Sequence, residues 1–347
     1  MTMEEKLSEA QEALLSWERL GPFQVELVPT GLINSTFRVH GPHGIYILHR
    51  LNAIFDPKVN LDINAVTLHL QKKGVASPML VHTDQEELFA IHESHCWRMQ
   101  THVSGRSFDE MVHPKMASEA GLCVGKFHQA LSDFNHTYHF VRPGVHDLQK
   151  HTQKLENVLL AYNDRPLYAE AAKLGDQLLN EAKKLPMSWA LPKRHSHGDL
   201  KVNNLLFDDQ QRAICLVDLD TVGLMHWHLE MGDALRSWCN PRGEDVEDTV
   251  FDVGIFEEAI RGYRQAGCDF LSHEEKELLV PGVLHITLEL AMRFLADVLE
   301  DCYFGWDPAR FPSRSMHNWV RAKGQWALYQ NIQQQRSALE KTSERTL

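Results

Sequence analysis

The stretch His195-Ser-His-Gly-Asp-Leu-Lys-Val-Asn-Asn-Leu-Leu-Phe207, followed by Leu216-Val-Asp-Leu-Asp-Thr-Val-Gly223, decides the fold of this 347-residue chain. Two short apolar runs flank the polar turn DDQQR, a pattern that predicts a β-hairpin. A hairpin centred near residue 211 pairs Asn204 with Asp218, because the two numbers are symmetric about it. Asp199 stands on the loop just before the first strand. Two carboxylates and one amide are therefore expected to meet at one end of the hairpin.

That set of side chains fits phosphoryl transfer. A carboxylate such as Asp199 can accept or orient the proton of an attacking hydroxyl, and the oxygens of Asn204 and Asp218 are hard ligands of the kind that Mg²⁺ prefers. Bound ions then neutralise charge on the transferred group, so that positioning dominates the catalysis. Polar residues that merely cap a hairpin are the alternative, since Asp and Asn favour turns. The presence of both halves at this separation favours the catalytic interpretation.

At these residues the chain resembles the kinase-like phosphotransferases. The run from His197 to Asn204 is similar to their HxDxxxxN catalytic loop, and Val217-Asp-Leu-Asp220 resembles the metal-binding strand of the aminoglycoside phosphotransferase and choline kinase group. The resemblance implies a bilobal, protein-kinase-like α+β fold, with a small antiparallel β-rich lobe, a larger helical lobe, and ATP with Mg²⁺ in the cleft between them. His197 is expected to hold the loop rather than to move a proton. The implied roles are catalytic base for Asp199, neighbour of the γ-phosphate for Lys201, and metal ligands for Asn204 and Asp218.

The nucleotide-binding part follows from the same resemblance. The segment from Thr30 to Val39 matches the strand–turn–strand that covers the ATP phosphates, although an ordinary hairpin turn has the same pattern. No lysine occurs in YILHRLN at 46–52, where a kinase keeps its phosphate-binding lysine, which leaves His49 or Arg50 to replace it. The stretch 97–103 falls where the adenine-binding hinge is expected. The implied nucleotide-binding residues are Gly31, Asn34, Ser35, Thr36, His49, Gln100 and His102.

Several pieces of the chain resemble a narrower subfamily, the N-acetylhexosamine 1-kinases. In that subfamily the sugar site draws on an arginine and a tyrosine, which here match Arg293 and Tyr303. The resemblance implies that an N-acetylhexosamine is phosphorylated on its anomeric hydroxyl, with Arg293, Tyr303, Asp220 and Arg236 as substrate-binding residues. Another sugar, an amino alcohol or an aminoglycoside stays open as the acceptor. The matching pieces are GLIN at 31–34, YILHRLN at 46–52, HGDLKVNNLLF at 197–207, LVDLDT at 216–221, GDALR at 232–236 and the stretch 292–304.

The chemistry of the last stretch allows two interpretations. A sugar site needs bidentate donors for hydroxyls and an amphipathic ring beside them, which Arg293 and Tyr303 can supply. Glu289, Arg293 and Asp297, however, follow one another at i, i+4 spacing and are also compatible with a solvated helix face. Asp233 is expected to brace the catalytic loop from a neighbouring helix.

The composition limits the classes of partner. Asp and Glu outnumber Lys and Arg by 47 to 35, which gives a formal net charge of −12 and disfavours a nucleic-acid partner. The six cysteines are scattered without a CxxC pair, and the N-terminus lacks a signal-peptide pattern, so a cytoplasmic protein with reduced thiols is expected. No apolar run approaches membrane-spanning length, which predicts no membrane contact. The oligomeric state stays open, and a nucleotide-binding regulatory protein without turnover is the non-enzymatic alternative.

The distribution of predicted elements indicates two units. The first hundred residues are rich in strands with one inserted helix, and the rest is mostly helical. The change near residue 103 predicts an N-lobe over 1–103 that covers the nucleotide, and a C-lobe over 104–347 that carries the catalytic loop and the substrate site. Within the C-lobe, a long apolar helix is expected over 283–301.

Overall fold

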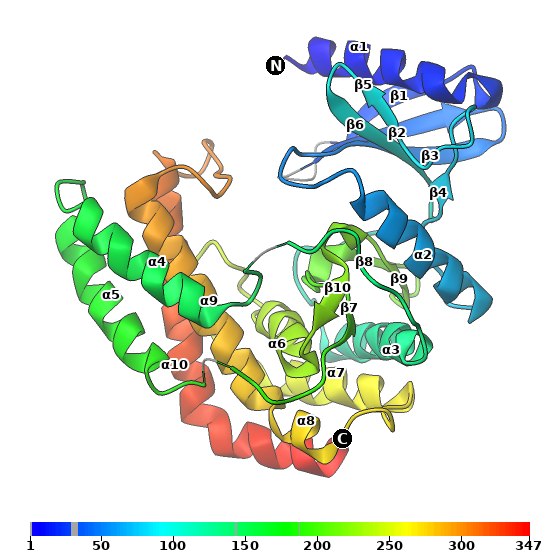
Figure 1. Ribbon diagram of the computed structural model, residues 1–347. Coiled ribbons are helices and arrows are strands. Elements are labelled where there is room, and N and C mark those ends of the chain that lie inside the picture. The colour runs from blue at the N-terminus through cyan, green and yellow to red at the C-terminus, as the bar shows by residue number, and fades with distance from the viewer. Residues whose placement is uncertain (1, 29–33, 143, 187) are drawn as a thin grey trace.

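The computed structural model describes residues 2–28, 34–142, 144–186 and 188–347, and it has the two-lobed α+β architecture expected from the sequence (Figure 1). The small lobe contains a six-stranded antiparallel sheet of order β1-β2-β3-β6-β4, with β5 paired to β6. Its elements are α1 (Met3–Ala13), the 3₁₀ helix η1 (Leu14–Leu20), β1 (Gln24–Val28), β2 (Ser35–Gly41), β3 (Gly44–Arg50), α2 (Val59–Lys72), β4 (Leu80–Val81), β5 (Ala90–His92) and β6 (His95–Thr101).

The two faces of this sheet have different neighbours, because successive side chains of a strand point to opposite sides. Phe37, Leu48 and Trp97 are fully buried in the cluster that the sheet forms with the N-terminal helices. Figure 1 accordingly shows α1 lying along one side of the sheet. His49 in β3 and Arg98 in β6, each next in sequence to one of these buried residues, therefore lie on the opposite face.

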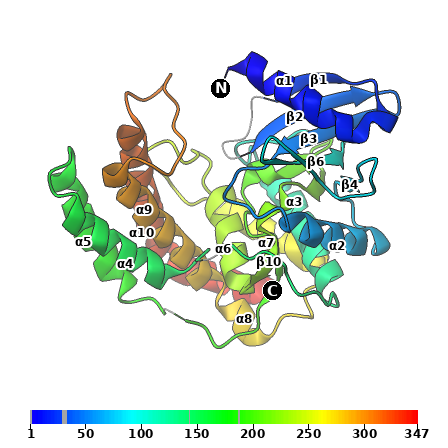
Figure 2. The same cartoon turned by 45° about the horizontal axis from the view of Figure 1, so that its top comes forward.

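The large lobe is built around α9, which packs against α4, α6 and α10, while α3 packs on α7. The strand pairs β8–β9 and β7–β10 lie on the side toward the sheet, and Figure 2 shows α4 and α5 on the far side of the lobe from α2. The elements are α3 (Pro114–Leu131), α4 (Leu148–Ala161), α5 (Tyr168–Ala182), β7 (Arg194–Ser196), η2 (Val202–Asn204), β8 (Leu205–Phe207), β9 (Ala213–Leu216), η3 (Leu219–Thr221), β10 (Gly223–Met225), α6 (Trp227–Trp238), α7 (Val253–Gln265), α8 (His273–Glu277), α9 (Leu279–Glu300) and α10 (Arg314–Thr346).

Helix α9 differs from the sequence-based expectation. It begins at Leu279, one turn earlier than predicted, because Pro281 lies in its first turn, where a missing N–H is tolerated. Its length and composition would also suffice to cross a membrane, contrary to the expectation, but 83% of its most apolar window is buried inside the protein. A side chain at Gly282 would approach the backbone oxygen of His228 to 2.0 Å, so α9 meets α6 backbone to backbone. These contacts are those of a core helix.

One segment joins the lobes and reaches the predicted hairpin. It leaves β6 after Thr101 and enters α3 at Pro114. On the way, Arg106 and Phe207 of β8 exchange two backbone hydrogen bonds of 2.8 and 2.9 Å. The connection is therefore tied to the hairpin that carries the candidate catalytic residues.

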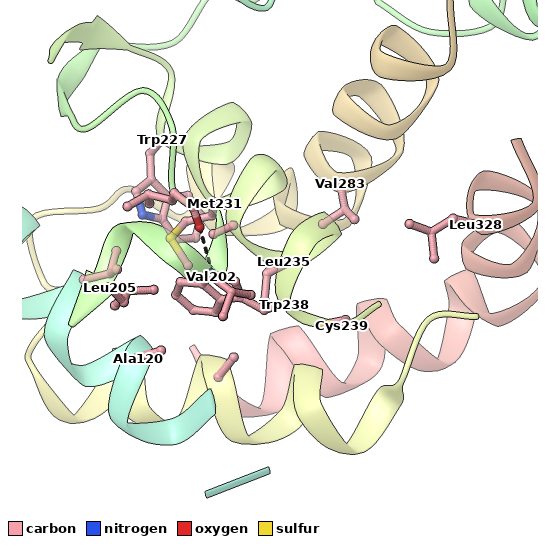
Figure 3. Packing of buried hydrophobic residues seen from close by; sticks show 14 of the residues in the cluster. Ala120, Val202, Leu205, Trp227, Met231, Leu235, Trp238, Cys239, Val283 and Leu328 are labelled. Carbon is pink, nitrogen blue, oxygen red and sulfur yellow. Dashed lines mark hydrogen bonds between the residues drawn. The ribbon is translucent and has the colours of Figure 1, made fainter. Parts of the chain in front are cut away.

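The hairpin and the loop before it rest on α6. Val202 and Leu205 are buried beside Met231 and Trp238 of this helix (Figure 3). The indole Nε1 of Trp238 donates a hydrogen bond of 2.8 Å to the backbone oxygen of Leu200. Apolar burial on both sides of the loop thus fixes its position against a rigid helix.

Candidate active site

The loop between β7 and β8 brings Asp199, Lys201 and Asn204 together. Oδ2 of Asp199 accepts hydrogen bonds from Lys201 Nζ at 2.8 Å and from Asn204 Nδ2 at 3.0 Å. The same amide group of Asn204 donates to the backbone oxygen of Asp199 at 2.8 Å. About a third of the Asp199 side chain is exposed, at 30%, so a hydroxyl group can still approach it.

Asp218 follows the hairpin, but in a register that differs from the predicted one. Leu205 pairs with Leu216, and the backbone N–H of Val217 donates to the oxygen of Asn204 at 2.9 Å. The predicted pairing of Asn204 with Asp218 is therefore wrong by one residue. Phe207 pairs with Ala213, which centres the turn on residue 210 instead of 211, and an extra residue in β9 between Ala213 and Cys215 makes up only half of the resulting shift. Asp218 leaves the ladder in the left-handed conformation, with φ 64° and ψ 57°, and is exposed to solvent.

Helix α6 holds the catalytic loop through one polar face. Glu230, Asp233 and Ser237 accept hydrogen bonds from the backbone amides of residues 197, 198, 200 and 202, at 2.6, 3.0, 3.1 and 3.3 Å. Their spacing of i, i+3 and i+7 places all three on the same side of the helix. The contact of Asp233 agrees with the expectation that it braces the loop.

Two residues of the loop are required by their type. Gly198 has φ +84°, and a Cβ there would lie 2.4 Å from the backbone oxygen of Thr221. The Nε2 of His197 donates to the oxygen of Val217 at 2.8 Å, and its Nδ1 accepts the N–H of Asp199 at 3.3 Å. Both ring nitrogens are engaged, so His197 links the catalytic loop to the Asp218 segment, in agreement with the structural role expected for it.

The charges of the site act on one another. Burial penalises the carboxylate of Asp199, but the charge of Lys201 and its hydrogen bond outweigh this and hold the pKa of Asp199 below its ordinary value. Burial also opposes the ammonium of Lys201, yet Asp199 and Asp218 raise its pKa, so it stays charged. Although Asp218 reaches solvent, loss of water on its protein side and the charge of Asp220 raise its pKa to about 6. A cation beside Asp218 would relieve this repulsion.

The donor set fits a hard divalent cation. The side chain of Asp218 forms no hydrogen bond or ion pair within the described part of the chain, and Asn204 uses only its amide nitrogen in the contacts with Asp199. A free carboxylate and an amide oxygen are ligands that Mg²⁺ accepts, with water completing the shell. Asp218 and Asn204 would hold the ion, and Lys201 would stay outside its shell as a separate positive charge.

Among the predicted nucleotide-binding residues, Asn34 and His49 lie in one polar network under the sheet. Asn34 Nδ2 donates to Oδ2 of Asp220 at 2.6 Å, and Asn34 Oδ1 accepts the N–H of Asn52 at 2.8 Å. His49 Nδ1 accepts hydrogen bonds from the guanidinium of Arg98, which also donates to Asp220. Ser35 and Thr36 open β2, Gln100 lies in β6 and His102 follows it, while Gly31 lies outside the described residues.

The predicted substrate residues Arg293 and Tyr303 lie in one cluster, which we call the acceptor wall: Arg142, Arg293, Tyr303 and Phe304, backed by Glu289. Arg142 donates a hydrogen bond to the hydroxyl of Tyr303, and the Arg293 guanidinium lies 5.6 Å from the ring centre of Phe304. Arg293 Nη1 is 3.6 Å from Oε1 of Glu289. Side-chain exposures of 25% for Arg293 and 48% for Tyr303 leave the wall open to a ligand.

The alternative of a solvated face on this helix is wrong. Glu289 and Asp297 are each only 1% exposed. Asp297 accepts the backbone amides of Cys302, Tyr303 and Phe304 at 2.8 to 2.9 Å, so it shapes the turn after α9. The buried carboxylates of α9 therefore support the wall from behind.

Asp220 and Arg236, the other two predicted substrate residues, are not brought to this wall. Asp220 is 2% exposed and lies beneath the sheet, bound by Arg98 and Asn34. Arg236 is 4% exposed and pairs with Asp233, at 3.0 Å, and with Glu244. The structure thus places Asp220 beneath the sheet of the small lobe and Arg236 behind Asp233, which holds the catalytic loop.

Comparison with known proteins places this site in a family. Residues 24–267 match the sequence model of the phosphotransferase enzyme family, which is more than half of the chain. The chain belongs to the phosphotransferase enzyme family. Solved structures of low sequence identity share the fold of this phosphotransferase over nearly its whole length. A microcompartment-associated aminopropanol kinase has 17% identity and a TM-score of 0.62, with 96% of this chain and 98% of that chain covered.

Two further structures show the same likeness in fold. The amicoumacin kinase hAmiN, in complex with AMP-PNP and Ca²⁺, has 13% identity and a TM-score of 0.62 over 95% of the phosphotransferase and 96% of its own chain. A choline kinase from Cryptosporidium parvum Iowa II has 14% identity and a TM-score of 0.59, with 97% and 96% covered. Identities this low show a common fold and do not indicate the acceptor of the phosphotransferase.

Sequence analysis of the phosphotransferase missed residues that act from a distance. Arg98 stood inside a stretch assigned to the hinge, and nothing local marked its contact with Asp220, 122 positions later. Arg142 was missed for the same reason. Glu230 and Ser237 could have been found, because polar residues at i and i+7 around Asp233 on an otherwise buried helix form one face.

Proposed function

We propose that this phosphotransferase is an ATP- and Mg²⁺-dependent kinase of a small polyhydroxy acceptor, with the anomeric hydroxyl of an N-acetylhexosamine as its preferred site. One observation carries the kinase proposal. Asp199 is held by Lys201 and Asn204 on a loop whose amides are fixed by α6, and Asp218 stands nearby without a partner among the described residues. The complex of the amicoumacin kinase with AMP-PNP and Ca²⁺ supports the same requirement for nucleotide and cation.

The mechanism follows from the positions of these groups. Asp199 accepts or orients the proton of the acceptor hydroxyl, and its lowered pKa keeps it ionised near neutral pH. Lys201 keeps its charge beside Asp199, where it would offset the negative charge of a bound phosphoryl group. Mg²⁺, when bound at Asn204 and Asp218, neutralises charge on the phosphates. Because α6 fixes the loop amides, the reacting groups need little reorganisation before transfer.

The acceptor wall favours an uncharged acceptor. Arg142 donates to the hydroxyl of Tyr303, and the guanidinium of Arg293 lies over the ring of Phe304, which packs edge-on against the ring of Tyr303. Fork-like donors and an aromatic ring suit vicinal hydroxyls and the face of a sugar. A quaternary or polycationic acceptor would be repelled by the two guanidinium groups. These features support a sugar over choline or an aminoglycoside.

A primary amino alcohol is the second candidate, and one observation favours it. Oε2 of Glu289 is buried and has no hydrogen-bond partner within the described part of the chain. An ammonium group of the acceptor would satisfy this oxygen. The structural likeness to an aminopropanol kinase points the same way.

An ATP-consumption assay with Mg²⁺ separates these acceptors. The panel holds N-acetylglucosamine, N-acetylgalactosamine, other hexoses, aminopropanol, choline, ethanolamine, homoserine and kanamycin, with Asp199→Asn protein as the blank. Saturable turnover with an N-acetylhexosamine, and a ¹H–³¹P coupling to the anomeric proton of the product, is the expected result. A 6-phosphate product would contradict the regiochemistry, and preference for aminopropanol would replace the sugar with the amino alcohol. ADP binding without turnover on any acceptor would favour the regulatory protein.

A further inference from the structure

The sheet face toward the large lobe contains one fixed positive charge on β3 and β6, that of Arg98. His49 and Arg98 are direct cross-strand partners and share this face. Arg50 lies on the other face, where its Nη1 contacts Glu9 of α1 at 2.5 Å. Of the two residues that could replace the missing lysine, only His49 therefore points toward the large lobe. Burial and the neighbouring Arg98 lower the pKa of His49 to about 3, so its ring is neutral.

Arg98 uses its guanidinium as a fork. Nε and Nη2 donate to Nδ1 of His49 at 3.3 and 3.2 Å, and Nη1 donates to Oδ1 of Asp220. The two side chains of the ion pair are only 1% and 2% exposed, so water does not screen them. The second oxygen of Asp220 is held by Asn34 at 2.6 Å, which leaves the carboxylate no freedom to rotate.

This ion pair joins the two lobes next to the segment that carries Asp218. Arg98 belongs to the sheet of the small lobe, whereas Asp220 lies two residues after Asp218 in the large lobe. Asp218 itself is in a left-handed conformation without a side-chain partner among the described residues. Its position therefore depends on how the chain on either side is held. His197 and Asn204 hold the backbone of Val217 before it, and Asp220 is the nearest side chain after it that has polar partners.

We propose that Arg98 is the positioning residue that sets Asp218 for the cation, through a buried interlobe ion pair with Asp220. Protein kinases instead require a lysine–glutamate ion pair within the small lobe to be in place. Arg98 acts through Asp220 and need not touch the nucleotide. The inference rests on the proposed Mg²⁺–ATP function.

Calorimetric titration with ADP tests the proposal without turnover. ADP affinity is measured against Mg²⁺ concentration for the wild type, Arg98→Gln, Asp220→Asn and the double variant. Each single variant is expected to raise the Mg²⁺ concentration for half-maximal ADP affinity about tenfold, and the double variant to do no more than either single one, because both remove the same contact. Metal-free ADP affinity should change less than twofold.

Further variants keep the proposal falsifiable. Arg98→Lys should not rescue, since a point charge cannot contact His49 and Asp220 together. Arg38→Gln is the matched control: Arg38 shares the same sheet face on β2, but it is exposed and pairs with Glu26 at 2.9 Å, so all affinities should stay unchanged. Loss of metal-free ADP affinity in Arg98→Gln alone would assign Arg98 to the phosphates instead. Additive effects in the double variant would overturn the positioning role. No ADP binding by the wild type at any Mg²⁺ concentration would instead overturn the proposed function.

Discussion

The catalytic loop and the acceptor wall are built in opposite ways. The loop is one continuous segment, and the backbone amides of four of its residues have acceptors on α6 within 3.3 Å. The wall is assembled from residues of three separate segments, around positions 142, 289–293 and 303. Its central carboxylate, Glu289, sits at the longer distance of 3.6 Å from His146, His151 and Arg293.

The difference indicates which region serves the chemical step and which serves the choice of acceptor. Chemistry common to a family needs groups held in one geometry, and a contiguous loop clamped on a helix provides it. Recognition of an acceptor requires polar groups whose hydrogen bonds are not all used within the protein. Glu289 and His146 each have side-chain atoms without a hydrogen-bond partner among the described residues. We therefore expect variants of the loop to lose the chemical step and variants of the wall to lose acceptor binding.

Asp199→Asn should have the largest effect. The amide keeps the shape of the side chain but cannot accept a proton, so kcat should fall about a thousandfold while the KM for ATP changes little. Initial rates of ADP release at saturating acceptor measure this. Near-normal kcat in Asp199→Asn would contradict the assignment of Asp199 as the base. It would also contradict the expectation that variants of the loop lose the chemical step.

Glu230→Gln should come next. Its two carboxylate oxygens accept the buried amides of His197 and Gly198 at 2.6 and 3.0 Å, and a glutamine leaves one of these donors unpaired. The expected cost is about 2 kcal/mol of stability, with a fall in kcat of roughly tenfold or more and little change in acceptor KM. Thermal unfolding and steady-state rates measure both.

The control for this variant is Glu258→Gln. Glu258 lies on α7 and pairs with Arg261 of its own helix, so its loss should cost less than about 0.5 kcal/mol. A rise in acceptor KM larger than the fall in kcat for Glu230→Gln would show that the loop and the wall are not separate.

The same contrast explains what sequence could predict. The catalytic loop was readable because its residues are close in sequence, and the two-lobed fold followed from it. The pairing of Asn204 was missed by one position, because neither the exact centre of the turn nor the extra residue in β9 leaves a signal in the sequence. Strands β7 and β10, also of three residues, were not predicted, since so few positions show no alternation.

Long-range contacts account for the other errors. Spacing along α9 could not show that Glu289 and Asp297 face the core. The helical period indicates which residues share a face of the helix, but not what that face contacts. Asp220 and Arg236 were assigned to the substrate from the resemblance of LVDLDT at 216–221 and GDALR at 232–236 to the narrower subfamily. Their partners, Arg98 and Glu244, come from segments that no local pattern connects to them.

Arg293→Ala should act on the wall alone. Loss of its guanidinium removes donors for the acceptor and should raise the acceptor KM about tenfold, with kcat for the remaining turnover lowered less than threefold. Arg310→Ala is the control, because Arg310 lies on the nearby turn and pairs with Asp245 at 2.9 Å. Rates with varied acceptor at fixed ATP distinguish them. A matching rise in the KM for ATP would place Arg293 at the nucleotide and contradict the wall.

The smallest effect on turnover is expected at His285, one turn before Glu289 beneath the wall, where the change is one of stability. Burial lowers its pKa in the folded protein to about 4, from an ordinary value of 6.5. Below pH 6.5 the unfolded chain therefore binds a proton at this histidine that the folded chain does not bind. The contribution of neutral His285 to the unfolding free energy is full above pH 6.5 and is lost as the pH falls toward 4. Between pH 7 and 5, His285→Leu should lose about 2 kcal/mol less of its unfolding free energy than the wild type. Urea unfolding at both pH values measures this, with the exposed His273→Gln on α8 as the control. An unchanged pH dependence of the unfolding free energy in His285→Leu would contradict this expectation. It would mean that the buried polar groups beneath the wall have hydrogen-bond partners as the catalytic loop does. The two regions would then differ in how they are assembled but not in how their polar groups are satisfied.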